Sequence, residues 1–316
     1  MTSHAASAAS SGAHVRITTR TATLSVGVAL FLILIKAWAW FATHSVAMLA
    51  SLADSTLDLA ASLFTFFAVR YAATPPDSEH RFGHGKAEAF AGLMQSGLVA
   101  LSAVLVGVEA VHHFIWPSPV SHGIEGIAVM AVSMLATLAL ITVQTQAVRQ
   151  TGSVATRGDR LHYAADLASN FAVILGIGAA AFWGLTWADA AAGLLVAVWL
   201  IWGAMKLSGE AADNLLDHEM SQEDRAQIIA LVLADPALRR VHDLRTRSSG
   251  PYMHIQMHVE LDPTMTLERA HHLIVGAEQR IRTSYPSADI IIHPDPRGRA
   301  EPHGHEDFEE RRQAEG

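Results

Sequence analysis

Residues 51–62 read SLADSTLDLAAS, where two aspartates stand four positions apart in an otherwise apolar run. On a helix, Asp54 and Asp58 would project from the same face, because residues four apart are neighbours on its surface. The surrounding segment 46–70 is long enough to cross a bilayer, which requires about 20 residues. Ionisable residues inside a membrane span are costly and point to a functional site. The stretch therefore predicts a membrane helix that carries a pair of functional carboxylates.

The composition is that of a membrane protein that can bind metal only through His and oxygen ligands. Hydrophobic residues make up 51% of the 316 positions and charged residues only 16%, which is few charges for a soluble domain. Cys is absent, so disulfides and thiolate metal sites are excluded. The formal net charge of -8 argues against nucleic acid as a partner.

Six apolar segments predict six transmembrane helices. They cover approximately residues 21–42, 46–70, 87–114, 123–146, 162–183 and 187–207. The connections 43–45, 115–122 and 184–186 contain no Lys or Arg, whereas the opposite side carries several. By the positive-inside rule, both termini are expected in the cytoplasm. Lys36 interrupts the first span, and we expect it to reach the outer interface or a partner carboxylate.

Charge density rises after about residue 208, which predicts a second, soluble domain. Its segments read as a helix from Ser221 to about 234, strands at 240–247 and 252–262, a helix at 265–284 and a strand at 289–293. This αββαβ order predicts a three-stranded sheet with both helices on one face. The predicted organisation is a disordered tail at 1–19, a six-helix membrane domain at 20–208, the soluble domain at 209–296 and a second disordered tail at 297–316.

The fifth predicted span begins near RLHYAADLASN, residues 160–170, and repeats the four-residue spacing with His162 and Asp166. One imidazole and three carboxylates would form a site that suits Zn²⁺ and accepts other divalent first-row metals. The alternative is that each pair makes hydrogen bonds between helices. Three acids in a low dielectric repel one another without a cation, which favours the metal site.

The same crowding of acids predicts exchange of metal for protons. Buried neighbouring carboxylates take up protons when no cation is bound, and metal ligands bind in their deprotonated form. Metal entry would therefore release protons. A site that opens to each side of the membrane in turn would then act as a proton-coupled antiporter.

Two further groups of candidate ligands lie outside the predicted spans. The loop PPDSEHRFGHGKAEA, residues 75–89, offers Asp77, His80 and His84, which form either a second metal site or a set of solvated loop residues. The soluble domain carries five candidates that its fold could bring together. They are His242, His258, His271, His293 and Asp295.

Five motifs, taken in order, resemble the cation diffusion facilitator (CDF) family, in its bacterial zinc and ferrous-iron efflux branch. They read SLADSTLDLAAS, HRFGHGKAEA, RLHYAADLASN, HDLRTRSSG and IIHPDP. The resemblance implies a homodimeric metal/proton antiporter of the bacterial inner membrane that exports Zn²⁺, with Cd²⁺ or Fe²⁺ as further substrates. It also implies a ferredoxin-like, metallochaperone-like cytoplasmic domain.

The resemblance assigns roles to the candidate residues. It implies a transport site at Asp54, Asp58, His162 and Asp166, and a loop site at Asp77, His80 and His84. It implies a cytoplasmic binuclear site at His242, His258, His293 and Asp295, with His271 beside them. Lys86 and Asp217 are similar to a charged pair at the family's dimer junction.

Two functions other than transport are compatible with a membrane protein that binds metal. A membrane-anchored metal sensor would not need ligands at membrane depth, so the intramembrane residues argue against it. An intramembrane metalloprotease is not supported, because the chain contains no His-Glu-x-x-His motif. The chain is therefore not expected to be an enzyme.

Overall fold

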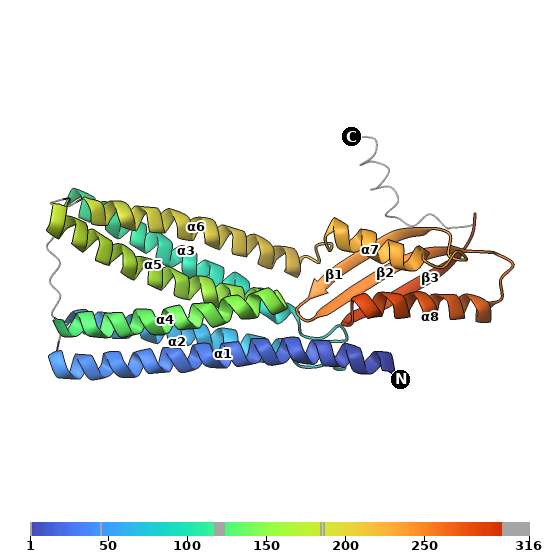
Figure 1. Cartoon of the computed structure of the whole chain (residues 1–316), viewed down its shortest axis with the longest axis horizontal. Helices are drawn as coiled ribbons and strands as arrows, with labels where there is room; N and C mark the ends of the chain where they lie inside the picture. The colour runs from blue at the N-terminus through green and yellow to red at the C-terminus, as the bar shows by residue number, and fades with distance from the viewer. Residues whose placement is uncertain (1, 45, 117–123, 184, 186, 299–316) are drawn as a thin grey trace. The chain divides into compact units, whose positions relative to one another are not determined.

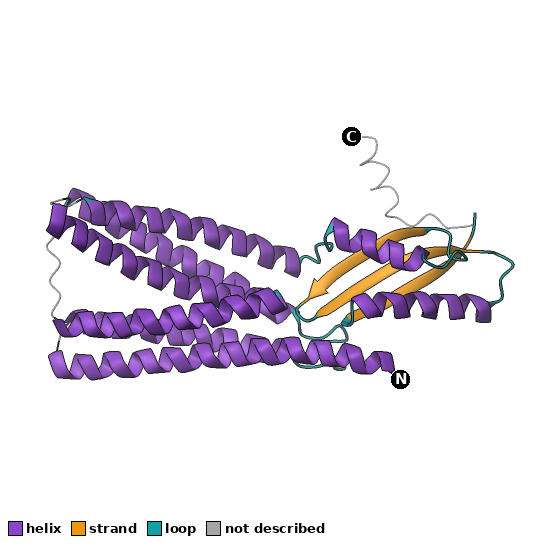
Figure 2. Ribbon diagram, viewed as in Figure 1, coloured by secondary structure: helices purple, strands orange, loops and turns teal. Residues whose placement is uncertain are grey.

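The computed structural model describes residues 2–44, 46–116, 124–183, 185 and 187–298. The chain divides into two compact units. One unit is His14–Leu215, and the other comprises Met1–Ala13 and Leu216–Gly316. The first unit is built from long helices, and the second contains a small sheet covered by two helices (Figure 2).

Six long helices build the first unit, which includes the first of them from His14 onward (Figure 1). They are α1 (Thr2–Thr43), α2 (Val46–Ala72), α3 (Lys86–Ile115), α4 (Ile124–Thr151), α5 (Val154–Trp183) and α6 (Ala188–Leu215). Over the described residues, five of the six, all except α5, are long and apolar enough to cross a membrane. The multi-span helical domain is thus confirmed. A sixth crossing, by α5, stays a prediction.

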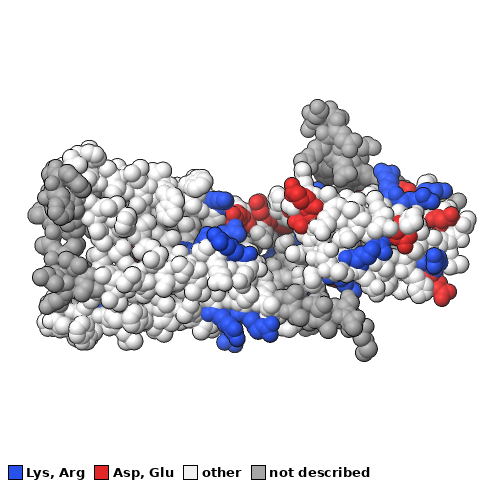
Figure 3. Space-filling model, in the orientation of Figure 1, with Lys and Arg blue, Asp and Glu red and all other residues white. Residues whose placement is uncertain are grey.

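The charges of the helical unit are distributed unevenly. On the face drawn in Figure 3, its Lys and Arg side chains gather towards one end. This is the distribution expected from the unequal loop charges, which the positive-inside rule assigns to the cytoplasm.

Glycine allows α5 to pack closely against its neighbours. A Cβ atom at Gly158 would lie 2.8 Å from the Cβ of Gln95 on α3, and one at Gly203 on α6 would lie 3.1 Å from Leu161 Cδ1. Small residues at helix contacts are typical of membrane bundles, since close backbone approach supplies the packing energy there. Through these contacts α5 packs against both α3 and α6, which also pack directly against each other.

Two predicted boundaries differ from the structure. The predicted tail at 1–19 is helical, because α1 begins at Thr2; the segment is rich in Ala and continues directly into a long helix, so it needs no new nucleus. The boundary at 208 falls inside α6, which runs to Leu215. Most of the second predicted tail, 299–316, lies outside the described residues.

The second unit has the predicted αββαβ order. It contains α7 (Gln222–Leu233), β1 (Val241–Ser249), β2 (Tyr252–Leu261), α8 (Leu267–Ser284) and β3 (Ala288–Pro296). Strand β2 is central, antiparallel to β1 and parallel to β3. Hydroxyls cap both helices: Ser221 Oγ accepts from the Asp224 N–H at 3.1 Å, and Thr266 Oγ1 from the Arg269 N–H at 3.3 Å.

Strand β2 separates an apolar face from a polar face. Ile255, Met257 and Val259 are at most 1% exposed and pack into one core with residues of both helices, including Ile228 and Ile281. The alternating residues of β2 are polar and face away from this core, as the period of two in a strand requires. Both helices therefore cover one face of the sheet (Figure 1), and the other face is left for polar side chains.

Candidate metal centres

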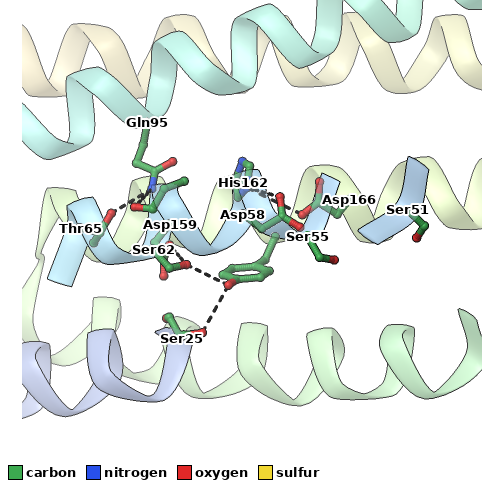
Figure 4. Close-up of polar contacts among 12 residues, drawn as sticks. Ser25, Ser51, Ser55, Asp58, Ser62, Thr65, Gln95, Asp159, His162 and Asp166 are labelled. Carbon is green, nitrogen blue, oxygen red and sulfur yellow. Dashed lines mark hydrogen bonds and ion pairs between the residues drawn. The ribbon is translucent and has the colours of Figure 1, made fainter. Parts of the chain in front are cut away.

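Three of the four predicted transport-site residues converge between α2 and α5. Asp58 Oδ1 lies 3.0 Å from His162 Nε2, and Asp166 Oδ2 lies 4.0 Å from the same nitrogen (Figure 4). One ligand atom from each residue lies within 4.8 Å of the other two. Asp58 and His162 are buried, 6% and 7% exposed. The prediction that the two helices bring their ligand pairs together is supported for these three residues.

Asp54 does not join the three residues in this structure. It lies one helical turn from Asp58 on α2 and is exposed, and the group that could hold an ion does not include it. Nearby, Lys36 Nζ on α1 donates to Ser55 Oγ at 2.6 Å and to the Ser51 carbonyl at 3.2 Å. Lys36 thus contacts α2 beside Asp54.

A second buried carboxylate, Asp159, lies on α5 and was not among the predicted site residues. It is 1% exposed and accepts hydrogen bonds from Ser62 Oγ at 3.2 Å and Gln144 Nε2 at 2.8 Å. The signal in the sequence is its spacing: Asp159 precedes His162 by three positions and Asp166 by seven, which places all three on one helix face.

The predicted loop residues form the second group. Asp77 Oδ1 lies 3.4 Å from His80 Nδ1, and Asp77 Oδ2 lies 3.4 Å from His84 Nε2. His84 is 7% exposed, and its ring stands 4.5 Å from that of Tyr71. Asp77 and His80 are exposed. The loop therefore brings together one acid and two imidazoles that could hold a divalent ion.

The turn that carries the loop site is held by Asp77. Its Oδ1 accepts from the backbone N–H of His80 at 2.6 Å and of Glu79 at 2.9 Å. The bond from His80 is the main cause that lowers the pKa of Asp77 below its usual value, because the donors favour the ionised form. The folded turn is therefore stabilised above the ordinary carboxyl pKa and loses this contribution as the pH falls through the lower, folded value.

We expect the turn to persist from pH 7 to about 4, the ordinary Asp value, and to loosen below it. The amide proton of His80, followed by NMR in the full chain, should shift with a single acidic transition. In the variant Asp77→Asn, whose side chain still accepts but does not titrate, that transition should vanish. A His80 amide shift that still titrates below pH 4 in Asp77→Asn would contradict this account.

The third group lies on the polar face of the sheet. Asp295 Oδ2 lies 3.0 Å from His242 Nε2 and 3.0 Å from His258 Nδ1, and Asp295 Oδ1 lies 3.3 Å from His293 Nε2. Antiparallel pairing sets His242 opposite His258, and parallel pairing sets His258 opposite His293. The strands therefore bring these four predicted ligands together. Sequence spacing alone could not show this.

The buried atoms of this group fit a divalent cation. Both ring nitrogens of His242 are buried without a hydrogen bond to any described residue, although one is close to a carboxylate oxygen. Imidazoles around a shared carboxylate form an N/O donor set that suits Zn²⁺. His242, His258 and Asp295 therefore form a group that could hold a divalent ion.

Three further predicted residues, His271, Lys86 and Asp217, lie outside the groups of described residues that could hold an ion. His271 is exposed on α8 and is not in the group that could hold an ion in a single chain. Lys86 Nζ donates to the Leu215 carbonyl at 3.0 Å, and Asp217 pairs with Arg247 at 3.1 Å. The role of His271 and a pairing of Lys86 with Asp217 stay predictions.

Comparison with known proteins identifies both parts of the chain. Residues 22–216 match the cation efflux transmembrane domain, and residues 220–297 match the cytoplasmic domain of cation efflux proteins. A solved structure titled "Mode of Action of a Putative Zinc Transporter CzrB (Zn form)" is 26% identical, with a TM-score of 0.26, and covers 27% of this chain and 99% of its own.

Curated relatives extend across most of the chain. The cation-efflux pump FieF of Cronobacter sakazakii is 42% identical over 258 residues, which is 82% of this chain and 86% of the relative. FieF of Klebsiella pneumoniae is 41% identical and FieF of Citrobacter koseri 40% identical, with the same coverage. The predicted resemblance is thus confirmed, and the chain belongs to the cation efflux (CDF) family of membrane transporters, not to a family of enzymes.

Proposed function

We propose that this protein exports Zn²⁺ from the cytoplasm in exchange for protons, with Cd²⁺ and Fe²⁺ as further substrates. The observation that carries the proposal is the convergence of Asp58, His162 and Asp166 between two helices of the membrane domain. Ionisable residues at this place in a bundle mark ion pathways and proton relays. The similarity to relatives named cation-efflux pumps supports the same direction of transport.

The ligand chemistry explains the exchange. To bind a cation, His162 must be neutral and the carboxylates must be ionised. Without a cation, the short contact between Asp58 and His162 is satisfied by a shared proton, because one partner must donate across 3.0 Å. Metal arrival would displace that proton. When the site opens to the other side, reprotonation would favour metal release, so the two fluxes would run in opposite directions.

Asp54 completes the proposed transport site as its fourth ligand. Its position one turn from Asp58 on the same helix face leaves it outside the present group, so binding would draw it in. We also propose that the protein is a homodimer located in the bacterial inner membrane. The match to the dimer-type cytoplasmic domain of cation efflux proteins supports this assembly.

A membrane-anchored metal sensor is the second candidate, and the group around Asp295 is the observation that favours it. A domain that holds its own ion could report metal without transport. The two functions differ in metal flux: the transporter moves Zn²⁺ across a sealed bilayer, and the sensor does not. Purified protein in liposomes, tested with Zn²⁺, Cd²⁺ and Fe²⁺ and an internal pH reporter, separates them.

The cytoplasmic group should set how transport depends on metal concentration. We expect His258→Ala to shift the concentration of half-maximal Zn²⁺ flux at least about threefold, while the maximal flux stays near that of the unchanged protein, because the transport-site ligands are intact. Flux against Zn²⁺ concentration in liposomes is the measurement. His218→Ala, an exposed histidine outside the group, is the control; equal curves for all three proteins would contradict a regulatory role.

A further inference from the structure

Asp159 joins four helices of the membrane domain through hydrogen bonds. Its two carboxylate oxygens accept separately from Ser62 on α2 and Gln144 on α4. The same Gln144 amide group also donates to Ser25 Oγ on α1 at 3.1 Å, and Tyr163 Oη on α5 lies 2.9 Å from Ser62 Oγ. All five side chains are at most 1% exposed. A buried carboxylate is tolerated only when such donors surround it.

This cluster lies one helical turn from the transport site on both ligand-bearing helices. On α2, Ser62 follows Asp58 by four positions. On α5, Asp159 precedes His162 by three. The contacts Ser62–Asp159 and Asp58–His162 are therefore successive cross-links between the same two antiparallel helices, about 5 Å apart along the axis. Fixing one cross-link fixes the register at the other.

We propose that Asp159 is a positioning residue for the transport site. Its hydrogen bond from Ser62 holds the register of α2 against α5 and so brings Asp58 and His162 to the separation that a tetrahedral ion requires. The inference rests on the proposed function in that it takes this group as the site of the transported ion. Asp159 itself is not in the group of described residues that could hold the ion.

The register should matter more to Zn²⁺ than to Cd²⁺. Zn²⁺ binds N and O ligands at about 2.0–2.2 Å with tetrahedral geometry, whereas the larger Cd²⁺ accepts longer bonds. Loosening α2 against α5 should therefore raise the Michaelis constant for Zn²⁺ more than that for Cd²⁺. Maximal flux should change less, since every ligand is retained. A general loss of folding would not produce this preference.

Ser62 and Thr65 provide a matched pair of variants. Both are buried hydroxyl residues on α2, 0% and 1% exposed, but Thr65 accepts from Gln95 Nε2 on α3 at 2.9 Å instead of bonding to α5. Partners that orient metal ligands contribute about 10–100-fold to affinity. We expect Ser62→Ala to raise the Michaelis constant for Zn²⁺ about tenfold and Thr65→Val to leave it within about twofold.

Two substitutions of Asp159 separate positioning from charge. In Asp159→Asn, the side-chain carbonyl still accepts from Gln144 and the amide can donate to Ser62 Oγ, so the cross-link remains. In Asp159→Ala it is lost. We expect the Michaelis constant for Zn²⁺ to rise about 10–100-fold in Asp159→Ala and no more than about threefold in Asp159→Asn. The preference for Zn²⁺ over Cd²⁺ should fall only in Asp159→Ala.

The measurement is flux of each ion into liposomes that hold the full chain, together with Zn²⁺ binding to the purified full chain. Asp58→Ala defines the share of binding that belongs to the transport site. Equal effects of Ser62→Ala and Thr65→Val, or an Asn variant as impaired as Ala, would overturn the proposal. If Asp159→Ala does not fold, the comparison of Ser62→Ala with Thr65→Val decides whether the contact to Asp159 positions the ligands. Absence of flux in the unchanged protein would refute transport, and the binding comparison would still decide positioning.

Discussion

Replacing Asp58 with alanine is expected to abolish Zn²⁺-driven proton movement in liposomes. Asp58 is the most buried carboxylate of the proposed transport site, and its Oδ1 lies 3.0 Å from His162 Nε2. Removal of a group that only orients a ligand costs about 10–100-fold, so loss of a direct ligand should lower the ratio of maximal flux to Michaelis constant at least about 100-fold. His162, Asp166 and the proposed fourth ligand Asp54 would leave a tetrahedral ion one ligand short.

The control for this experiment is Asp213→Ala. Asp213 is exposed near the end of α6 and lies outside every group that could hold an ion, so the same substitution there should leave flux within about twofold, as for most surface changes. Retention of the proposed dimer by both variants, checked by size-exclusion chromatography, separates loss of a ligand from loss of folding. Proton movement that persists in Asp58→Ala would refute the proposed transport site.

Replacing His162 with aspartate should change which ion is preferred. His162 supplies the only nitrogen in the group, and an all-carboxylate site suits harder cations such as Mn²⁺. We expect the preference for Zn²⁺ over Mn²⁺ to fall at least about tenfold, with metal transport retained. Competition between the two ions for uptake into liposomes measures the ratio.

His112→Asp is the matched control for ion preference. His112 is exposed near the end of α3 and lies outside the groups that could hold an ion. The same change there should leave the preference as it was. A Zn²⁺ to Mn²⁺ ratio that falls equally in both variants, or in neither, would show that the imidazole of His162 does not select the ion.

Local patterns in the sequence predicted the helices and the pairing of ligands on each. Asp54 and Asp58 on α2 are four residues apart, and so are His162 and Asp166 on α5. Helix geometry alone places each pair on one helix face. The alternation in β2 predicted its apolar and polar faces for a similar reason. Neither pattern states which helices meet, so the 3.0 Å contact between Asp58 and His162 required the packed bundle.

What the sequence did not predict depends on packing between distant segments. Asp159 was not among the predicted site residues, because the partners that identify it, Ser62 and Gln144, lie on other helices. Asp54 was grouped with Asp58 by spacing, but side chains one turn apart need not reach the same point. The helical start of α1 differs from the predicted tail because small, polar residues can extend a helix that already exists.

Strand β2 couples the folding of the cytoplasmic domain to the geometry of its candidate metal site. Ile255, Met257 and Val259 face the core, and His258, between the last two, faces the metal group. Because adjacent residues point to opposite faces, a shift by a single position would exchange the two sets entirely. An insertion or deletion of one residue within β2 would therefore remove core and ligands together, whereas a substitution at His258 can alter metal binding while the hydrophobic core stays intact.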